Sequence, residues 1–508
     1  MKILKSTVLS AAALSAMALG ANAQVPERPK LVVGIVVDQL RTDYLEVLQG
    51  YFGEKGFKAL LRDGVYMRDV DFKVPGLDAV NSTAMLQTGA YPSVTGVPAD
   101  AIYDASSLSS KLRMPLAHYN GSTLTNDSFT PGALRLSTIS DELVIDSRGL
   151  SNVYSVAVDP QQAVILAGHN GKGAFWINNS TGNWATTSYY GTLPASLSNR
   201  NMRSALSQRV DTMQWRKYRF SRQDRDVYRK FAASPLANRE VTDVAIELIN
   251  GLNLGSKSGT TDMLNVAYTL APYKYSTESS PREELTDAYR RLDTQIGRLI
   301  EAVDRKVGAS NAIIWLTSTG YYDDALPVED KYRLPVGEFS SKKAKSLLNS
   351  YLSAKYGSGA YVATIRDGQV FFDRKVMEAV KTDPETIISD AKMFLVKMNG
   401  VADAYTLSEI IKPSTGEIEA LRLSIDPGSS GDIILKFTPG VTVAYDDMTP
   451  PQTRYVREAG VMTPAVIRAP GLKSKVISTT VDAVQLAPTV AGQLRIRAPN
   501  GASAKAEF

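Results

Sequence analysis

Uninterrupted apolar runs are the most regular feature of the chain. Residues 31–37 form a run rich in valine and isoleucine that ends in one carboxylate, Asp38. A similar run over residues 153–158 ends in Asp159, and a third covers residues 312–318. Continuous β-branched runs of this length are typical of strands buried on both faces in a parallel sheet. Open α/β sheets bind ligands at the carboxyl ends of such strands, so Asp38 is a candidate site residue.

Segments with apolar residues at helical spacing alternate with these runs. The spacing predicts helices within residues 42–64, 136–145 and 281–307, and the short apolar run 163–167 predicts a further strand. Alternating strands and helices indicate an α/β fold, with a mostly parallel central sheet flanked by helices.

The pattern changes between about residues 325 and 451. Short apolar stretches on either side of Asp367 and Gly368 predict a β-hairpin, with helices near 341–355 and 383–398. We interpret this region as an inserted α+β lobe. The expected domain then has its core at about 30–190, 240–324 and 452–500, with inserted loops at about 191–239.

The first 23 residues have the features of a secretory signal peptide. Lys2 and Lys5 precede an apolar stretch, and Ala21-Asn22-Ala23 has the form of a cleavage site. No later run is apolar over the roughly 18 residues that a transmembrane helix needs. We therefore expect residues 24–508 to be exported after cleavage near Ala23, to the periplasm or the outer membrane. The lack of cysteine suits an envelope protein that folds without disulfides.

Net charge and histidine content restrict the chemistry. The formal charge of +5 falls to +3 when Lys2 and Lys5 are removed, which is too weak to indicate a nucleic acid or an anionic membrane as partner. The chain has only two histidines, His118 and His169. Hydrolytic zinc centres usually have several imidazole ligands, so two histidines are few for such a centre.

Seven short motifs follow one another along the chain. They occupy residues 36–44, 56–64, 86–96, 167–169 with 174–176, 287–293, 469–472 and 481–489. In kind and order they resemble the alkaline phosphatase superfamily, in particular its type I phosphodiesterase/nucleotide pyrophosphatase branch. The resemblance covers nearly all of the chain after the signal peptide and implies an alkaline-phosphatase-like fold.

The resemblance also implies a site, and this chain departs from it. Members of the family are expected to bind two zinc ions that bridge a phosphate ester above a Thr or Ser nucleophile. Carried over by position, the first-strand ligand is retained as Asp38, whereas the nucleophile position falls on Asp78. The other family positions fall on residues of different chemistry: Thr319 and Gly320 for an Asp-His pair, Pro272 and Ser276 for an Asp-x-x-x-His motif, Met462 for the last His, Asp100 for a phosphate-binding Asn, and Asp159 and Gln161 for a Lys and an Arg.

These departures predict a degenerate site. We expect no catalytic residue, no bound metal and no cofactor, with Asp38 as the one retained family ligand. The leading hypothesis is an exported pseudoenzyme that retains the phosphatase fold and binds envelope proteins of unknown identity, with the 325–451 lobe as partner surface.

Two alternatives remain open. One is a divergent metal-dependent phosphomonoesterase or phosphodiesterase that uses carboxylates such as Asp38 and Asp78, for which Mg²⁺ or Ca²⁺ suits the oxygen ligands better than Zn²⁺. The other is a glycan- or nucleotide-binding module with a stacking surface of Trp315, Tyr321 and Tyr322.

Overall fold

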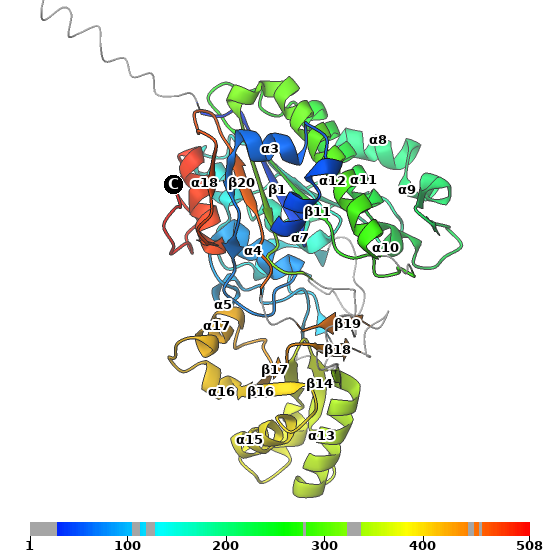
Figure 1. Cartoon of the computed structure of the whole chain (residues 1–508), viewed down its shortest axis with the longest axis vertical. Helices are drawn as coiled ribbons and strands as arrows, with labels where there is room; N and C mark the ends of the chain where they lie inside the picture. The colour runs from blue at the N-terminus through cyan, green and yellow to red at the C-terminus, as the bar shows by residue number, and fades with distance from the viewer. Residues whose placement is uncertain are drawn as a thin grey trace, which may run out of the picture.

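The computed structural model describes residues 28–103, 112–117, 128–277, 281–322, 337–445, 452–456 and 460–508. An α/β core lies above a smaller lobe, as Figure 1 shows. The expected cleavage point near Ala23 lies outside the described residues. Within the described ranges, no helix is both long and apolar enough to cross a membrane.

A nine-stranded sheet forms the middle of the core, in the order β21-β2-β20-β12-β1-β11-β6-β7-β8. Strands β12, β1, β11, β6 and β7 run parallel, whereas β20 is antiparallel to both of its neighbours and β8 to β7. The strands are β1 (Leu31–Asp38), β2 (Val65–Met67), β6 (Val153–Val156), β7 (Gly173–Ile177), β8 (Trp184–Ala185), β11 (Asp262–Thr269), β12 (Ala312–Ser318), β20 (Ala465–Arg468) and β21 (Lys475–Ile477). The α/β prediction with a mostly parallel sheet is confirmed.

Strand β1 lies near the centre of the sheet and is buried over its whole length. Its alternate side chains enter two different hydrophobic clusters, Val33 and Ile35 on one face and Val32 and Val36 on the other. Gly34 allows close packing: a Cβ atom there would lie 2.3 Å from the Asn265 side chain and 2.8 Å from the Trp315 ring. Burial on both faces is the reason why the run is continuously apolar.

Helices cover both faces of the sheet (Figure 1). One face carries α3 (Phe57–Asp63), α11 (Leu236–Gly251) and α12 (Pro281–Val307). The other carries α4 (Ala79–Thr88), α6 (Ile139–Asp146), α7 (Pro160–Ala167) and α18 (Leu486–Leu494). The remaining core helices and short strands are α2 (Thr42–Val47), α5 (Pro92–Thr95), α8 (Ala195–Arg203), α9 (Leu206–Arg209), α10 (Val227–Ala232), β3 (Val70–Asp71), β4 (Ile102–Tyr103), β5 (Leu112–Arg113), β9 (Gln214–Trp215), β10 (Tyr218–Arg219) and β22 (Val481–Asp482).

Two of the sequence motifs meet where α3 contacts α12. The Asp293 carboxylate accepts hydrogen bonds from the backbone N–H groups of Gly53 and Phe57, both at 2.8 Å. A Cβ atom on Gly56 would lie 2.2 Å from this carboxylate. Asp293 therefore connects α12 to the start of α3, and Asp293 and Gly56 have a structural role in their motifs.

Two element predictions were wrong. Residues 163–167 belong to helix α7 instead of a strand, because a fully buried helix is also apolar on all sides and a short run cannot distinguish the two. The helix expected over residues 42–64 is divided into α2, a 3₁₀ turn (Gln49–Tyr51) and α3. The interruption coincides with the loop whose N–H groups bind Asp293.

The lobe has its own hydrophobic cluster and two small sheets, β13-β18-β19 and β14-β15-β17-β16. Its elements are β13 (Gly337–Ser340), α13 (Ser341–Tyr356), β14 (Val362–Arg366), β15 (Gln369–Phe372), α14 (Arg374–Glu378), α15 (Pro384–Leu395), β16 (Val401–Thr406), α16 (Leu407–Ile410), α17 (Glu417–Ser424), β17 (Ile433–Phe437), β18 (Val441–Tyr445) and β19 (Gln452–Tyr455). The expected boundaries near 325 and 451 fall outside the described residues, so this division of the chain stays a prediction.

Candidate functional site

The carboxyl ends of β1, β11 and β12 meet around the side chain of Asp38. The Thr319 hydroxyl, just after β12, donates to Asp38 Oδ1 at 2.9 Å and accepts the Gln39 N–H at 3.0 Å. The Thr269 hydroxyl at the end of β11 donates to Asp38 Oδ2 at 3.4 Å. Asp38 is 8% exposed. We refer to Asp38, Thr269 and Thr319 as the strand-end group.

Gly320 lies against a buried aromatic ring. Its φ is +80°, and a Cβ atom there would lie 2.1 Å from the ring of Phe72. Phe72 is itself only 3% exposed. A histidine, which the family pattern requires at this position, therefore has no room while Phe72 keeps its place.

The aromatic residues proposed as a stacking surface do not form one together. Trp315 is 2% exposed, inside the core. Tyr322 instead packs near Tyr44, with the Arg41 guanidinium 4.7 Å from its ring centre and 4.5 Å from that of Tyr44. A binding surface that includes Trp315 is ruled out by this burial.

Asp78 begins helix α4 as its N-cap residue. Its Oδ1 accepts the N–H groups of Val80 and Asn81 at 2.7 and 2.8 Å, and its Oδ2 accepts the N–H of Asp100 at 2.7 Å. Burial raises the pKa of Asp78 well above its usual value, and the nearby charge of Asp100 adds to the effect. Both carboxylate oxygens are thus engaged by backbone donors.

Asp159 has the same role at the start of helix α7. It accepts the N–H groups of Gln161 and Gln162 at 2.8 and 3.0 Å. Burial raises the pKa of Asp159 to about 6, and Asp100 contributes in the same direction. The Gln161 side chain donates to the Asp100 carbonyl at 2.8 Å, which connects the two helix starts. We refer to Asp78, Asp100, Asp159 and Gln161 as the helix-cap group.

The three remaining predicted positions have other contacts. Pro272 follows β11 and is half-buried. The Ser276 hydroxyl lies 2.9 Å from the Tyr218 hydroxyl. Met462 is 47% exposed, and its carbonyl accepts the Thr42 N–H at 3.0 Å. The structure therefore forms two groups from the predicted residues, with Gly320, Pro272, Ser276 and Met462 in neither.

Sequence reasoning missed three residues of this region: Thr269, Phe72 and Gln162. Thr269 had a usable signal, because it ends an apolar run that the structure pairs in parallel with β1. Gln162 donates to the Ala79 carbonyl at 3.3 Å and stands next to a predicted residue. Nothing in the local sequence indicates that Phe72 would lie against Gly320.

His169 has a structural environment. Its Nδ1 lies 3.1 Å from Asp141 Oδ2 and its Nε2 lies 2.9 Å from the Leu134 carbonyl oxygen. The hydrogen bond to Asp141 raises the pKa of His169. Both ring nitrogens are thus engaged within the fold, and His118 lies outside the described residues.

The described donors do not fit a pair of zinc ions. Across the described ranges, no three His, Asp or Glu side chains form a group that could hold a metal ion. Two carboxylates of the helix-cap group, those of Asp78 and Asp159, accept backbone hydrogen bonds.

A large parallel sheet between two helical layers, with candidate residues at its carboxyl edge, defines an alkaline-phosphatase-like protein. The family model for type I phosphodiesterase / nucleotide pyrophosphatase matches residues 32–462. The chain belongs to this family, within the alkaline phosphatase superfamily, as the motifs predicted.

Relatives with established names match the chain over nearly its full length. It is 26% identical to alkaline phosphatase PafA of Elizabethkingia meningoseptica, covering 99% of this chain and 98% of the relative. It is 26% identical to a protein of Myroides odoratus named calcium-transporting ATPase, over 98% and 97% of the two chains. The crystal structure of PafA superposes with a TM-score of 0.81, over 94% of this chain and 98% of that one.

The expectation that the chain has no cofactor is contradicted by these relatives. They include alkaline phosphatases, which are metal-dependent enzymes with zinc. The expectation relied on the small number of histidines, and that count does not limit oxygen ligands. Carboxylates such as Asp323 and Asp324 lie in the segment 323–336, outside the described residues.

Proposed function

We propose that this protein is a member of the phosphodiesterase family that does not hydrolyse phosphate esters and acts as an exported binding or scaffold protein of the cell envelope. The observation that carries the proposal is Asp78. The family pattern requires a Thr or Ser nucleophile at this position, and a carboxylate with both oxygens held by backbone N–H groups stands there instead.

The position of Asp78 also disfavours phosphate binding at the same place. The first N–H groups of a helix attract anions, and a phosphate above α4 would need them as donors. Asp78 already occupies the N–H groups of Val80 and Asn81. When it is ionised it repels a phosphate dianion as well.

The close contact of Gly320 with Phe72 gives a second line of support. A side chain at Gly320 would collide with the buried ring, so the structure does not accommodate the strand-end histidine of the family pattern. Two positions of the family's expected catalytic site, Asp78 and Gly320, are thus occupied by residues whose contacts are structural.

A second candidate is a divergent metal-dependent phosphoric ester hydrolase. It is favoured by the relatives, which include alkaline phosphatases, and by Asp38, the retained family ligand at the end of β1. The two candidates differ in turnover, which can be measured directly.

The test is hydrolysis of aryl phosphate monoesters and diesters by the purified protein with zinc supplied. We expect rates equal to those without protein, and no change in Asp38→Ala. The matched control is Asp63→Ala, which removes an exposed carboxylate of α3. Zinc-dependent turnover that survives Asp63→Ala and is abolished by Asp38→Ala would overturn the proposal in favour of the hydrolase.

The scaffold role is tested separately, in cells. A photo-crosslinking residue at Met393, 54% exposed on the lobe, is compared with one at Val47, 76% exposed on the core. We expect cross-linked envelope proteins from position 393 and none from position 47. The same products from both positions, or none from either, would contradict the lobe as partner surface.

A further inference from the structure

The amino ends of the parallel strands β12, β1, β11, β6 and β7 meet at one edge of the central sheet, opposite the strand-end group. The segments that enter these strands are bonded to one another there. The Asp262 N–H donates to the Lys30 carbonyl at 3.0 Å, and the Lys30 N–H donates to the Asn311 carbonyl at 2.7 Å. This edge is at the end of the core opposite the lobe (Figure 1). We call it the amino-edge face, and it consists of residues 28–30, 145–152, 170–172, 252–261 and 305–311.

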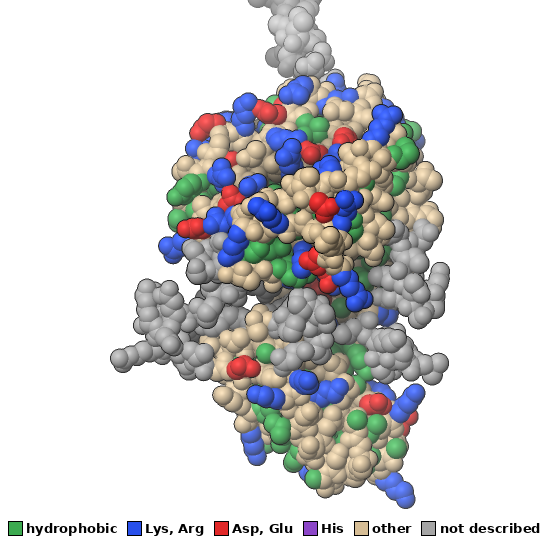
Figure 2. Space-filling view, turned by 90° about the vertical axis from the view of Figure 1, so that its right-hand side faces the viewer, with side chains coloured by type: hydrophobic (Ala, Val, Ile, Leu, Met, Phe, Trp, Pro, Cys, Tyr) green, Lys and Arg blue, Asp and Glu red, His purple; other side chains and the backbone are tan. Residues whose placement is uncertain are grey.

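The amino-edge face is strongly basic. Its segments contain seven Lys or Arg residues and one acidic residue, Asp146. This excess of six positive charges is larger than the +3 of the whole mature chain, so the charge of the protein is unevenly distributed. Figure 2 shows Lys and Arg side chains at this upper end of the core. A weak net charge therefore does not exclude a charged binding surface.

Most of these charges are not paired with a carboxylate. Arg28 pairs with Asp146. Lys30 and Arg148 are exposed, and no carboxylate of the described residues pairs with either. Three lysines donate to neutral oxygen atoms: Lys172 to the Asn152 side chain at 2.8 Å, Lys257 to the Leu150 carbonyl at 3.3 Å, and Lys306 to the Asn253 side chain. A neutral acceptor leaves the positive charge of a lysine uncompensated.

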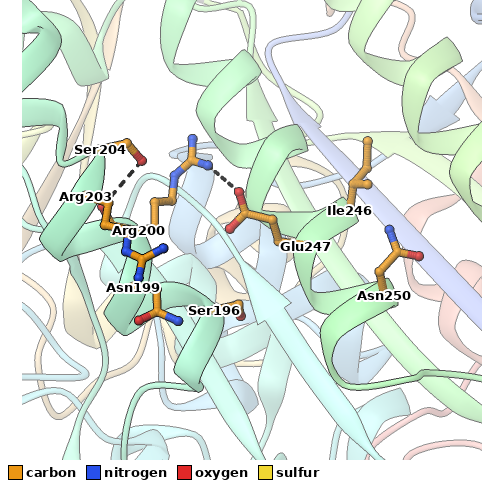
Figure 3. Close-up of a pocket in the computed structure, with 8 residues that line it drawn as sticks. All are labelled: Ser196, Asn199, Arg200, Arg203, Ser204, Ile246, Glu247 and Asn250. Carbon is orange, nitrogen blue, oxygen red and sulfur yellow. Dashed lines mark hydrogen bonds and ion pairs between the residues drawn. The ribbon is translucent and has the colours of Figure 1, made fainter.

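The basic residues on the side of the core are held differently. In the cavity of about 450 Å³ between α8 and α11, Arg200 binds Glu247 and also Glu240, the latter at 2.8 Å (Figure 3). Carboxylates of the fold compensate that guanidinium. The uncompensated charges of the amino-edge face are instead available to an anion from outside the protein.

Two apolar side chains project from the same face. Ile145 is 51% exposed and Leu150 is 59% exposed. Both belong to the turn that follows α6, in which the Arg148 N–H donates to the Ile145 carbonyl at 3.0 Å. A polyanion in solution would bind the charges and leave these side chains in water. An anionic lipid surface offers both phosphate groups and an apolar layer, so it matches both features.

We propose that the amino-edge face binds the surface of a membrane that contains anionic lipids. Ile145 and Leu150 enter the head-group layer, and Arg148 and the lysines lie against the lipid phosphates. In this orientation the lobe points away from the membrane (Figure 1). None of the residues to which the family's site positions were carried over lies in this face. The inference therefore goes beyond the proposed function and does not depend on it.

The test is co-sedimentation of the full-length mature protein with lipid vesicles. One set contains phosphatidylcholine alone, and the other also contains about one quarter phosphatidylglycerol, which is anionic. We expect binding to the anionic vesicles to be at least about tenfold tighter, and to be largely lost in about 0.5 M sodium chloride. Equal binding to both sets, or no binding to the anionic set, would overturn the proposal.

Polyphosphate distinguishes a lipid surface from a polyanion in solution. At equal phosphate concentration, we expect it to bind more weakly than the anionic vesicles, because it offers no apolar layer to Ile145 and Leu150. Polyphosphate binding as tight as vesicle binding would overturn the membrane as the occupant of this face.

Two charge reversals compare the ends of β11. Lys257→Glu lies before this strand, in the amino-edge face, and should weaken vesicle binding by at least about fivefold. The matched control is Lys274→Glu, an exposed residue after the carboxyl end of the same strand, which should leave binding unchanged. Equal effects of the two changes would show that only the net charge matters, and would contradict the site.

Two further variants test the apolar contact. Leu150→Ser should weaken vesicle binding by about fivefold, whereas Val47→Ser, at a position 76% exposed on α2, should not. All four side chains are exposed, so the variants should fold. Unchanged binding in Leu150→Ser would contradict entry into the head-group layer. Phosphatase turnover in the same samples would contradict only the proposed function.

Discussion

Asp38 and Asp78 are both buried carboxylates, each 8% exposed, and they are held by different kinds of donor. In the strand-end group, the hydroxyls of Thr319 and Thr269 donate to Asp38. In the helix-cap group, backbone N–H groups at the start of α4 and at Asp100 donate to Asp78. One carboxylate is bound by side chains at the end of a strand, and the other by the backbone.

This difference separates two halves of the family's candidate site. The nucleophile and phosphate positions now cap α4 and α7, so their carboxylates belong to the helical framework. Asp38 keeps its position at the end of β1 and depends on side-chain partners. Removing a helix-cap carboxylate should therefore cost more stability than removing a contact of the strand-end group.

The largest effect is expected for Asp78→Ala. The change leaves three backbone N–H groups without their acceptor, those of Val80, Asn81 and Asp100. We expect the free energy of unfolding to fall by about 3 kcal/mol, from a lost N-cap and buried unsatisfied donors. Urea denaturation at neutral pH measures it.

The control for this prediction is Asp78→Asn, because asparagine also caps helices well. It keeps one oxygen for the N–H groups of Val80 and Asn81 but places an amide NH2 against the N–H of Asp100, so it should lower the stability by about 1–2 kcal/mol, less than Asp78→Ala. If Asp78→Ala and Asp78→Asn cost the same, capping is not the role of Asp78 and the contrast between the two groups fails.

A smaller effect is expected for Thr319→Val in the strand-end group. Valine has nearly the same shape but leaves Asp38 without its 2.9 Å donor and the Gln39 N–H without its acceptor. The expected loss is about 1–2 kcal/mol, by the same denaturation measurement. Thr319→Ser keeps the hydroxyl and should lie much nearer to wild type. A loss as large as that of Asp78→Ala would show that the two groups contribute alike.

The central part of the fold could be predicted from residue pattern alone. The continuous apolar run before Asp38 identifies a strand buried on both faces, and the structure has β1 there. Residues 163–167 were misassigned because burial on all sides removes the periodicity that distinguishes a helix from a strand. The interruption within residues 42–64 depends on Asp293, which is distant in sequence.

The candidate site was predictable where it follows a strand end or a family motif. Asp38 could be found because it ends an apolar run, and Asp78 because its motif resembles the family. The second contact of Asp78 comes from the N–H of Asp100, and the lack of room for a side chain at Gly320 comes from Phe72. Those contacts are tertiary, so no local pattern contains them.

The last predicted effect concerns the pH dependence of stability, and it compares two helix caps. Burial raises the folded-state pKa of Asp159 from 3.8 to about 6, so the folded protein binds this proton more tightly than the unfolded chain. The resulting stabilisation is fully present below about pH 4 and is lost as the pH rises through about 6.

In Asp159→Asn this titration is absent while the cap of α7 is kept. Between about pH 4 and about pH 7, the wild type should therefore lose about 2 kcal/mol relative to Asp159→Asn, measured by urea denaturation across that range. The matched control is Asp373→Asn, the N-cap of α14, which accepts two backbone N–H groups at 2.9 and 3.2 Å outside the helix-cap group. If Asp159→Asn and Asp373→Asn give curves of the same form, the burial of Asp159 has no separate effect.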